Sequence, residues 1–177
     1  MNQRKLTSDP GAYIGLALGC ASCVARGEPQ MYKRILVPVD GSELSDRAIQ
    51  ASVDLAKQLG AAITGFVAEP LLPVRPGPRS RAWVEEEAEE HDAVTTAHAS
   101  DVLGRFEACA RAAGVEFDGY YDQVPRVDRA IIEAAESRGC DLILMVTHGR
   151  GAFGEFLFGS QTKAVLAGSK LPLLVLH

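Results

Sequence analysis

The sequence has no hydrophobic run of about 18 residues, which excludes a membrane-spanning helix. Basic residues are in the minority, with 18 Lys and Arg against 23 Asp and Glu and a formal net charge of −5. That balance argues against a surface built to bind nucleic acid or anionic lipid. The 177 residues suit one domain, and an apolar content of 47% is ordinary. We therefore expect a soluble, mildly acidic single domain.

Cysteines are few, and none of the four suggests a metal or redox centre. Cys20 and Cys23 form a Cys-x-x-Cys pair, but two further zinc ligands are not nearby and no convincing strand precedes the pair. The acidic run at 85–90 stands near the start of a predicted helix, where the helix dipole favours negative charge. We interpret that run as a solvated face rather than a metal site. Reduced thiols point to a reducing compartment, so we expect a cytoplasmic location.

Residues 1–30 match none of the elements that follow. Two basic residues and a glycine-diluted apolar stretch at 12–24 faintly resemble a secretory signal. At Met31 the composition changes abruptly to that of a strand. We therefore expect residues 1–30 to be an N-terminal extension, either a disordered tail or sequence upstream of a true start at Met31, and residues 31–177 to be the domain.

From Met31 onward, segments typical of strands and of helices alternate. The runs at 34–39 and 141–146 are almost wholly apolar, which is typical of strands covered on both faces. The whole pattern predicts strands at 34–39, 62–67, 115–121, 141–146 and 171–176, and helices at 44–59, 83–113, 127–137 and 160–167. This order predicts an α/β fold: a five-stranded parallel sheet with helices on both faces, a Rossmann-like three-layer sandwich.

Ligands of such a sheet bind beyond the carboxyl ends of the strands, where the strand order reverses. The loops to inspect are therefore 40–42, after the first strand, and 147–160, after the fourth. Both are rich in small and polar residues.

The second loop contains a misleading glycine motif. Residues 149–154 read Gly-x-Gly-x-x-Gly, the fingerprint of dinucleotide-binding folds. That fingerprint needs an acidic residue about 20 positions further on to hold the ribose. After Gly154 the chain contains no Asp and a single Glu, directly beside the glycine. A Walker-type phosphate loop is also absent from the sequence, so neither motif applies.

A different spacing in this loop suggests an anion site. Gly149 is followed by nine residues and then by the pair Gly159-Ser160, which opens a predicted helix. Backbone N–H groups at a helix start, the Ser160 hydroxyl and the nearby Arg150 would together bind a phosphate chain. The alternative is that Gly159 and Ser160 only cap the helix.

These segments together resemble the universal stress protein family over Met31 to His177. The residues that carry the resemblance are 33–42, 141–151, 158–160 and 171–175. The resemblance implies the adenine nucleotide α-hydrolase-like version of the fold.

The nucleotide-binding branch of that family has the motif Gly-x-x-Gly, nine residues, then Gly followed by Ser or Thr. By resemblance, Gly149 is the second glycine, Gly159 the third and Ser160 the hydroxyl. The first glycine falls on Val146, which is a departure. A valine side chain there would crowd a nucleotide unless the strand end turns it aside.

The resemblance implies ATP, with or without Mg, as the ligand. Asp40 would lie near the ribose or the phosphates, Val67 would meet the adenine and Met145 would line the base pocket. For Asp40 the alternative is a plain turn residue. The full set of expected nucleotide-binding residues is Pro38, Val39, Asp40, Val67, Met145, Val146, Gly149, Arg150, Gly159, Ser160, Gln161 and Thr162.

No catalytic set stands out in the sequence, so we expect a binding protein with at most slow ATP hydrolysis. The apolar last strand, Leu171 to Leu176, would lie at a sheet edge and pair with a second copy, as the resemblance also implies. The leading hypothesis is a dimeric, ATP-binding, nucleotide-responsive stress regulator. The alternatives are a nucleotide-free dimeric interaction or chaperone-like module, and an adenylyl- or phosphoryl-transfer enzyme supported only by Asp40 and His148.

Overall fold

A computed structural model describes residues 31–73, 76–77, 80–147 and 159–177 of the chain. The expected extension at 1–30 and most of the glycine-rich loop lie outside these residues.

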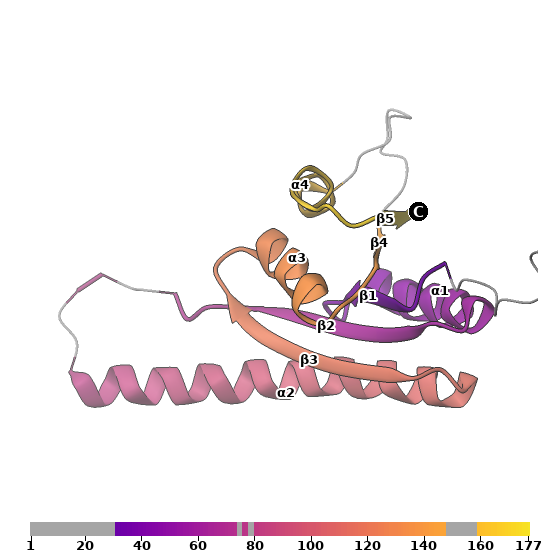
Figure 1. The fold of residues 1–177 in the computed structure, drawn as a ribbon. Coiled ribbons are helices and arrows are strands. Elements are labelled where there is room, and N and C mark those ends of the chain that lie inside the picture. Colours follow the sequence, from indigo (N-terminus) through magenta and orange to yellow (C-terminus); the bar gives the residue numbers. More distant parts are fainter. Residues whose placement is uncertain (1–30, 74–75, 78–79, 148–158) are drawn as a thin grey trace, which may run out of the picture.

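Five strands and four helices alternate along the described chain, as predicted (Figure 1). They are β1 Arg34–Pro38, α1 Glu43–Leu59, β2 Ala62–Pro70, α2 Arg81–Ala113, β3 Phe117–Val124, α3 Val127–Ser137, β4 Leu142–Val146, α4 Ser160–Gly168 and β5 Leu173–Leu176. All neighbouring strands pair in parallel, in the order β3-β2-β1-β4-β5. The predicted α/β fold with a five-stranded parallel sheet is confirmed.

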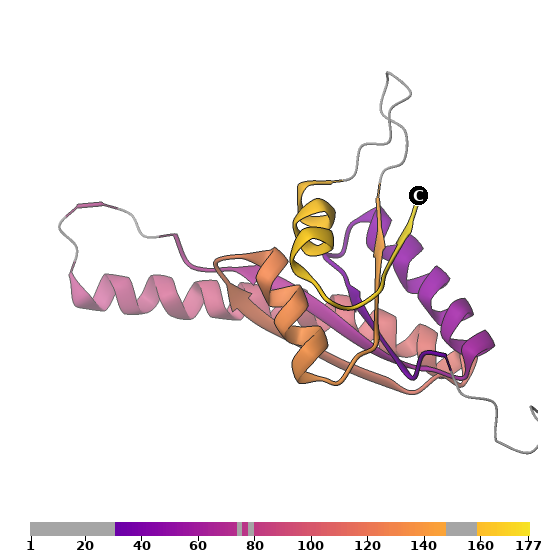
Figure 2. The same ribbon diagram turned by 45° about the horizontal axis from the view of Figure 1, so that its top comes forward.

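Helices cover both faces of the sheet (Figure 2). One core contains buried residues of α1 and α2, such as Val53 and Phe106, against β1 and β2. A second core contains Ile131 of α3 and Val165 of α4, packed against Leu36 and other residues of the opposite face. The strands are covered on both sides, which explains why β1 and β4 are apolar at successive positions.

Several element ends differ from those the sequence predicts. Strand β2 continues to Pro70 instead of ending at residue 67, because Glu69 and Pro70 pair in register with the end of β3. Pairing with β2 also moves β3 two to three residues later than predicted. The last strand begins at Leu173 rather than Leu171, since the Leu171 N–H is used by the Ser169 hydroxyl at 3.0 Å.

Asp141 joins the first and fourth strands at the end opposite the ligand loops. Its two carboxylate oxygens accept hydrogen bonds from the N–H groups of Lys33 and Arg34 at 2.8–3.1 Å. The strand order reverses between these two strands, so the contact helps to hold β1 and β4 in place on either side of that point.

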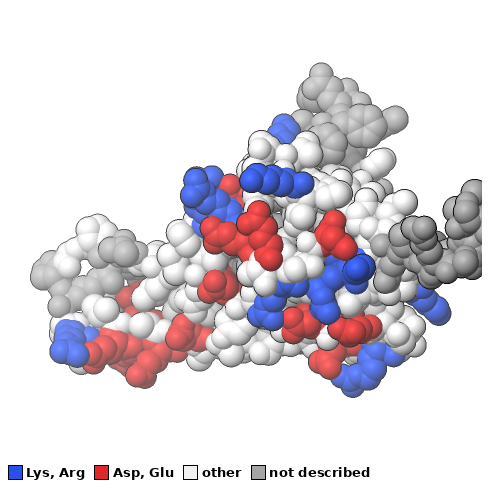
Figure 3. All heavy atoms as spheres, viewed as in Figure 1, with Lys and Arg blue, Asp and Glu red and all other residues white. Residues whose placement is uncertain are grey.

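Helix α2 extends well beyond the sheet (Figure 1). It has 33 residues, begins at a Ser80 cap whose side chain accepts from the Trp83 N–H, and has Thr95 as its first buried residue. Acidic side chains gather along the projecting half (Figure 3). None of the helices in the described ranges combines the length and apolar character that a bilayer crossing requires.

Candidate functional site

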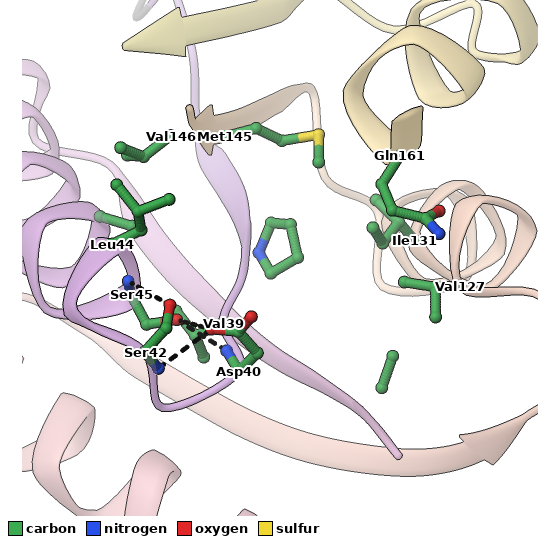
Figure 4. A pocket seen from close by; sticks show the side chains of 13 residues that line it. Val39, Asp40, Ser42, Leu44, Ser45, Val127, Ile131, Met145, Val146 and Gln161 are labelled. Atoms are coloured by element: carbon green, nitrogen blue, oxygen red, sulfur yellow. Dashed lines mark hydrogen bonds between the residues drawn. The ribbon is translucent and has the colours of Figure 1, made fainter. Parts of the chain in front are cut away.

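A pocket of about 350 Å³ opens at the carboxyl ends of β1 and β4, where the strand order reverses (Figure 4). This is the position at which open parallel sheets bind ligands. Its lining residues are Pro38, Val39, Asp40, Ser42, Leu44, Ser45, Ala48, Ala68, Val127, Ile131, Met145, Val146 and Gln161.

The polar end of the pocket is the turn between β1 and α1. The Oδ1 atom of Asp40 accepts from the Ser45 hydroxyl at 2.6 Å and from the Ser42 N–H at 3.1 Å (Figure 4). The same Ser45 oxygen accepts from the Asp40 N–H at 2.7 Å. Ser42 is also the N-cap of α1 and accepts from the Ser45 N–H. The carboxyl group is therefore held in one orientation by its own turn.

This hydrogen bonding keeps Asp40 ionised. Partial burial on its own raises the pKa of Asp40, but the hydrogen bonds from Ser42 and Ser45 together outweigh it and hold the pKa below its ordinary value. The pocket therefore presents a fixed negative charge at neutral pH.

Gly41 allows α2 to approach this turn closely. It has φ of 76°, in the left-handed region that favours glycine. A Cβ atom there would lie 3.0 Å from both His98 Nε2 and Val102 Cγ2 of α2. Any larger residue would strain the turn and push against α2, so the position of Asp40 depends on this glycine.

The opposite wall of the pocket is apolar. It combines Met145 at the end of β4, Ala68 of β2, and Val127 and Ile131 on one face of α3. Val146 lies across from them beside Leu44 (Figure 4). A slot with apolar walls and a few polar groups at one end is the usual form of a small-molecule site.

Val67 does not line this pocket, although the sequence analysis placed it against the adenine. Its side chain is fully buried in the core on the α1 and α2 side, and the pocket lining contains its neighbour Ala68 instead. Successive side chains of a strand point to opposite faces, so only one of the two can face the slot.

The start of α4 stands beside the pocket. Its N-cap is Gly159, so no side chain caps the helix, and its first residue is Ser160. Both residues are exposed. Gln161 lines the pocket, whereas Thr162 is buried beneath the helix and does not. The two remaining expected residues, Gly149 and Arg150, lie outside the described residues.

Of the expected set, the structure brings together Pro38, Val39, Asp40, Met145, Val146 and Gln161. Sequence reasoning missed Ser45 and the α3 residues Val127 and Ile131. The i, i+4 spacing of the α3 pair marks an inward helix face, but it does not show what that face meets. Within the described ranges, no group of three or more His, Cys, Asp or Glu residues is placed to hold a metal ion.

The sheet order and the pocket at its switch point define a doubly wound α/β domain with a pocket between its first and fourth strands. Residues 31–177 match the universal stress protein family. The chain belongs to that family.

Two curated relatives are similar over most of their length. Universal stress protein MJ0531 of Methanocaldococcus jannaschii is 27% identical over 161 residues, which cover 87% of this chain and 86% of the relative. The universal stress protein in the QAH/OAS sulfhydrylase 3′ region of Thermus aquaticus is 31% identical over 156 residues, or 83% of this chain and all of the relative.

Solved structures share the fold. A universal stress protein in complex with cAMP has a TM-score of 0.58 and 23% identity, covering 82% of this chain and 97% of the other. The universal stress protein of Archaeoglobus fulgidus in complex with dAMP has a TM-score of 0.53 and 18% identity, covering 82% and 98%. Both of these related folds hold an adenine nucleotide.

Proposed function

We propose that the pocket between β1 and β4 binds ATP and that the protein is a dimeric, nucleotide-responsive regulator of a cytoplasmic stress response. The observation that carries the proposal is the pocket itself: an apolar slot at the switch point with a fixed carboxylate at one end and a helix start nearby. The adenine nucleotides held by two similar folds support the same ligand class.

Each part of the nucleotide has a matching part of the site. The apolar slot by Met145 and Ile131 suits the flat adenine ring. The oriented Asp40 carboxylate accepts from a ribose hydroxyl, because a carboxylate can only accept at neutral pH. The phosphates lie at the start of α4, where the N–H groups and the Ser160 hydroxyl donate. Gly149 and Arg150 are proposed to complete the phosphate site.

The Ser160→Ala change tests the placement of the phosphates. We expect MgATP affinity to fall about three- to tenfold, which corresponds to the loss of one ordinary hydrogen bond. Titration calorimetry of the full chain measures this, with Ser100→Ala on the exposed side of α2 as the matched control. Unchanged affinity in Ser160→Ala would remove the hydroxyl from the phosphate site.

The Val146→Gly change tests the departure from the family motif. Val146 lines the pocket but also packs against the core on the α1 side. Its side chain is therefore directed partly away from the slot, and we expect the wild-type protein to bind MgATP. Removing the side chain is expected to lower stability by about 1–2 kcal/mol and to leave affinity equal or higher. Calorimetry with thermal unfolding separates the two effects.

The second candidate function is a nucleotide-free interaction module. It is favoured by the Val146 side chain, which lines the pocket at the position of the first motif glycine. No binding heat in the wild type together with binding in Val146→Gly would mean that the valine closes the pocket.

Under either candidate, β5 is the proposed dimer edge, since Leu173–Leu176 is apolar, half-buried and pairs with β4 on one side. Sedimentation equilibrium tests the dimer.

A further inference from the structure

The projecting half of α2 is exposed along its length. We define residues 81–94 as the acidic arm; none of them is buried. The end of β2 lies alongside it, since His91 Nε2 is 2.9 Å from the carbonyl oxygen of Pro70. The arm therefore differs from the other helices, which have buried residues packed against the sheet.

Exposed apolar side chains concentrate on and beside this arm. Seven large hydrophobic residues are exposed in the described part of the chain, and four of them are Leu71, Trp83, Val84 and Val94. Leu71 directly follows the β2 end that contacts His91, and the other three belong to the arm. Trp83 is 44% exposed and Val94 63%. Exposed large apolar side chains grouped at one end of a molecule are candidates for contact with a partner.

The apolar and acidic residues form one stripe. Trp83 and Val94 are eleven residues apart, which is three helical turns, so they share a face about 16 Å from one another. Glu86 and Glu90 lie between them, one and two turns after Trp83. Along one side of the arm the order is therefore apolar, acidic, acidic, apolar.

The charge of the arm indicates which kind of partner would fit it. Six acidic residues stand against one described basic residue, Arg81, which pairs with Glu85 at 2.7 Å. Figure 3 shows the acidic side chains along this end of the molecule. Two such arms would repel one another, which argues against pairing with a second copy. These acidic side chains do not converge on a metal site either.

We propose that the acidic arm binds a basic amphipathic helix of a partner protein. The partner presents apolar residues eleven positions apart, to meet Trp83 and Val94, with Lys or Arg between them to meet Glu86 and Glu90. Trp is frequent among residues that dominate binding energy, and opposite charges around it fix the register. This proposal does not depend on nucleotide binding.

The probe is a synthetic helical peptide of about 18 residues, with two Leu eleven positions apart, Lys at the fourth and seventh positions after the first Leu, and Ala and Gln elsewhere. Trp83 is the only Trp of the chain, so its emission reports binding at this place. We expect a saturable blue shift that weakens as salt is added. A peptide with the same composition but with its Leu residues on the opposite face from its Lys residues is the control. Equal binding of that control would overturn the proposal.

Matched variants locate the contact, measured by the anisotropy of labelled peptide. Trp83→Ala should weaken binding at least tenfold, whereas Leu166→Ala, another exposed apolar residue, should not change it. Both variants replace an exposed helical residue with Ala, so both should fold, which circular dichroism checks. Unchanged binding in Trp83→Ala would overturn the proposal.

The charge contribution has its own pair of variants. Glu86→Gln with Glu90→Gln should weaken binding about three- to tenfold at low salt, and Glu133→Gln with Glu136→Gln on α3 should leave it unchanged. An equal loss in both double variants would mean that the peptide responds only to net charge, which contradicts a specific site. A peptide-induced doubling of the protein mass would contradict it as well.

Discussion

Phe106→Ala is expected to lower the free energy of unfolding by about 3–5 kcal/mol. Phe106 is fully buried at the centre of the contact between α2 and the sheet. Its ring centroid lies 4.8 Å from that of Phe117 on β3. Gly65 of β2 makes room for these rings, since a Cβ there would lie 2.8 Å from the Phe117 ring. Truncation would leave a cavity that neighbouring strands cannot close.

Urea unfolding followed by circular dichroism measures this loss, with Leu166→Ala as the control. Leu166 is 60% exposed, so its truncation should change stability by about 0.5 kcal/mol or less. A loss below about 1 kcal/mol in Phe106→Ala would show that α2 contributes little to the core. The acidic arm would then belong to a helix that is only loosely packed against the sheet.

The alternation of elements was predictable because each one has a strong local signal. The apolar runs of β1 and β4 and the helical spacing of α1 reflect burial that recurs with a fixed period. The element ends were less predictable. Glu69 and Pro70 become strand only because β3 offers them partners in register, and no local pattern marks that pairing.

The structure has a pocket at the switch point, where the sequence analysis looked for a site, but several of its lining residues were not expected. The switch point follows from the topology, which the order of elements already implies. To decide whether Val67 or Ala68 lines the pocket, one must know which residues of β2 point to which face of the sheet. A strand that is apolar on both faces gives no alternation from which to read this. The contribution of α3 depends on how that helix packs across the sheet, which its own spacing does not reveal.

Asp40→Asn is expected to weaken MgATP binding about 10- to 100-fold, the range for losing a hydrogen bond to a charged group. The amide oxygen can still accept from the Ser42 N–H and the Ser45 hydroxyl, so the turn should persist. The group left facing the ligand is then an NH2 donor, which cannot accept from a ribose hydroxyl. Calorimetry of the full chain measures the change. An affinity within threefold of wild type would assign Asp40 to the turn alone.

Ser45→Ala separates the orientation of Asp40 from its charge. The bond from Ser45 helps to hold the pKa of Asp40 below its ordinary value, so removing the hydroxyl should raise that pKa. A carboxyl group with a lowered folded pKa stabilises the protein above its unfolded pKa, and this contribution is lost as the pH falls through the folded value. Ser45→Ala should therefore lose this contribution, so its stability deficit against the wild type in urea unfolding should be largest near neutral pH and should shrink as the pH falls below about 4. Ser52→Ala is the control, because that buried hydroxyl of α1 bonds only the Ile49 carbonyl, at 2.9 Å. If the deficit of Ser52→Ala shrinks equally at low pH, the effect belongs to helix α1 and not to the carboxylate at the pocket.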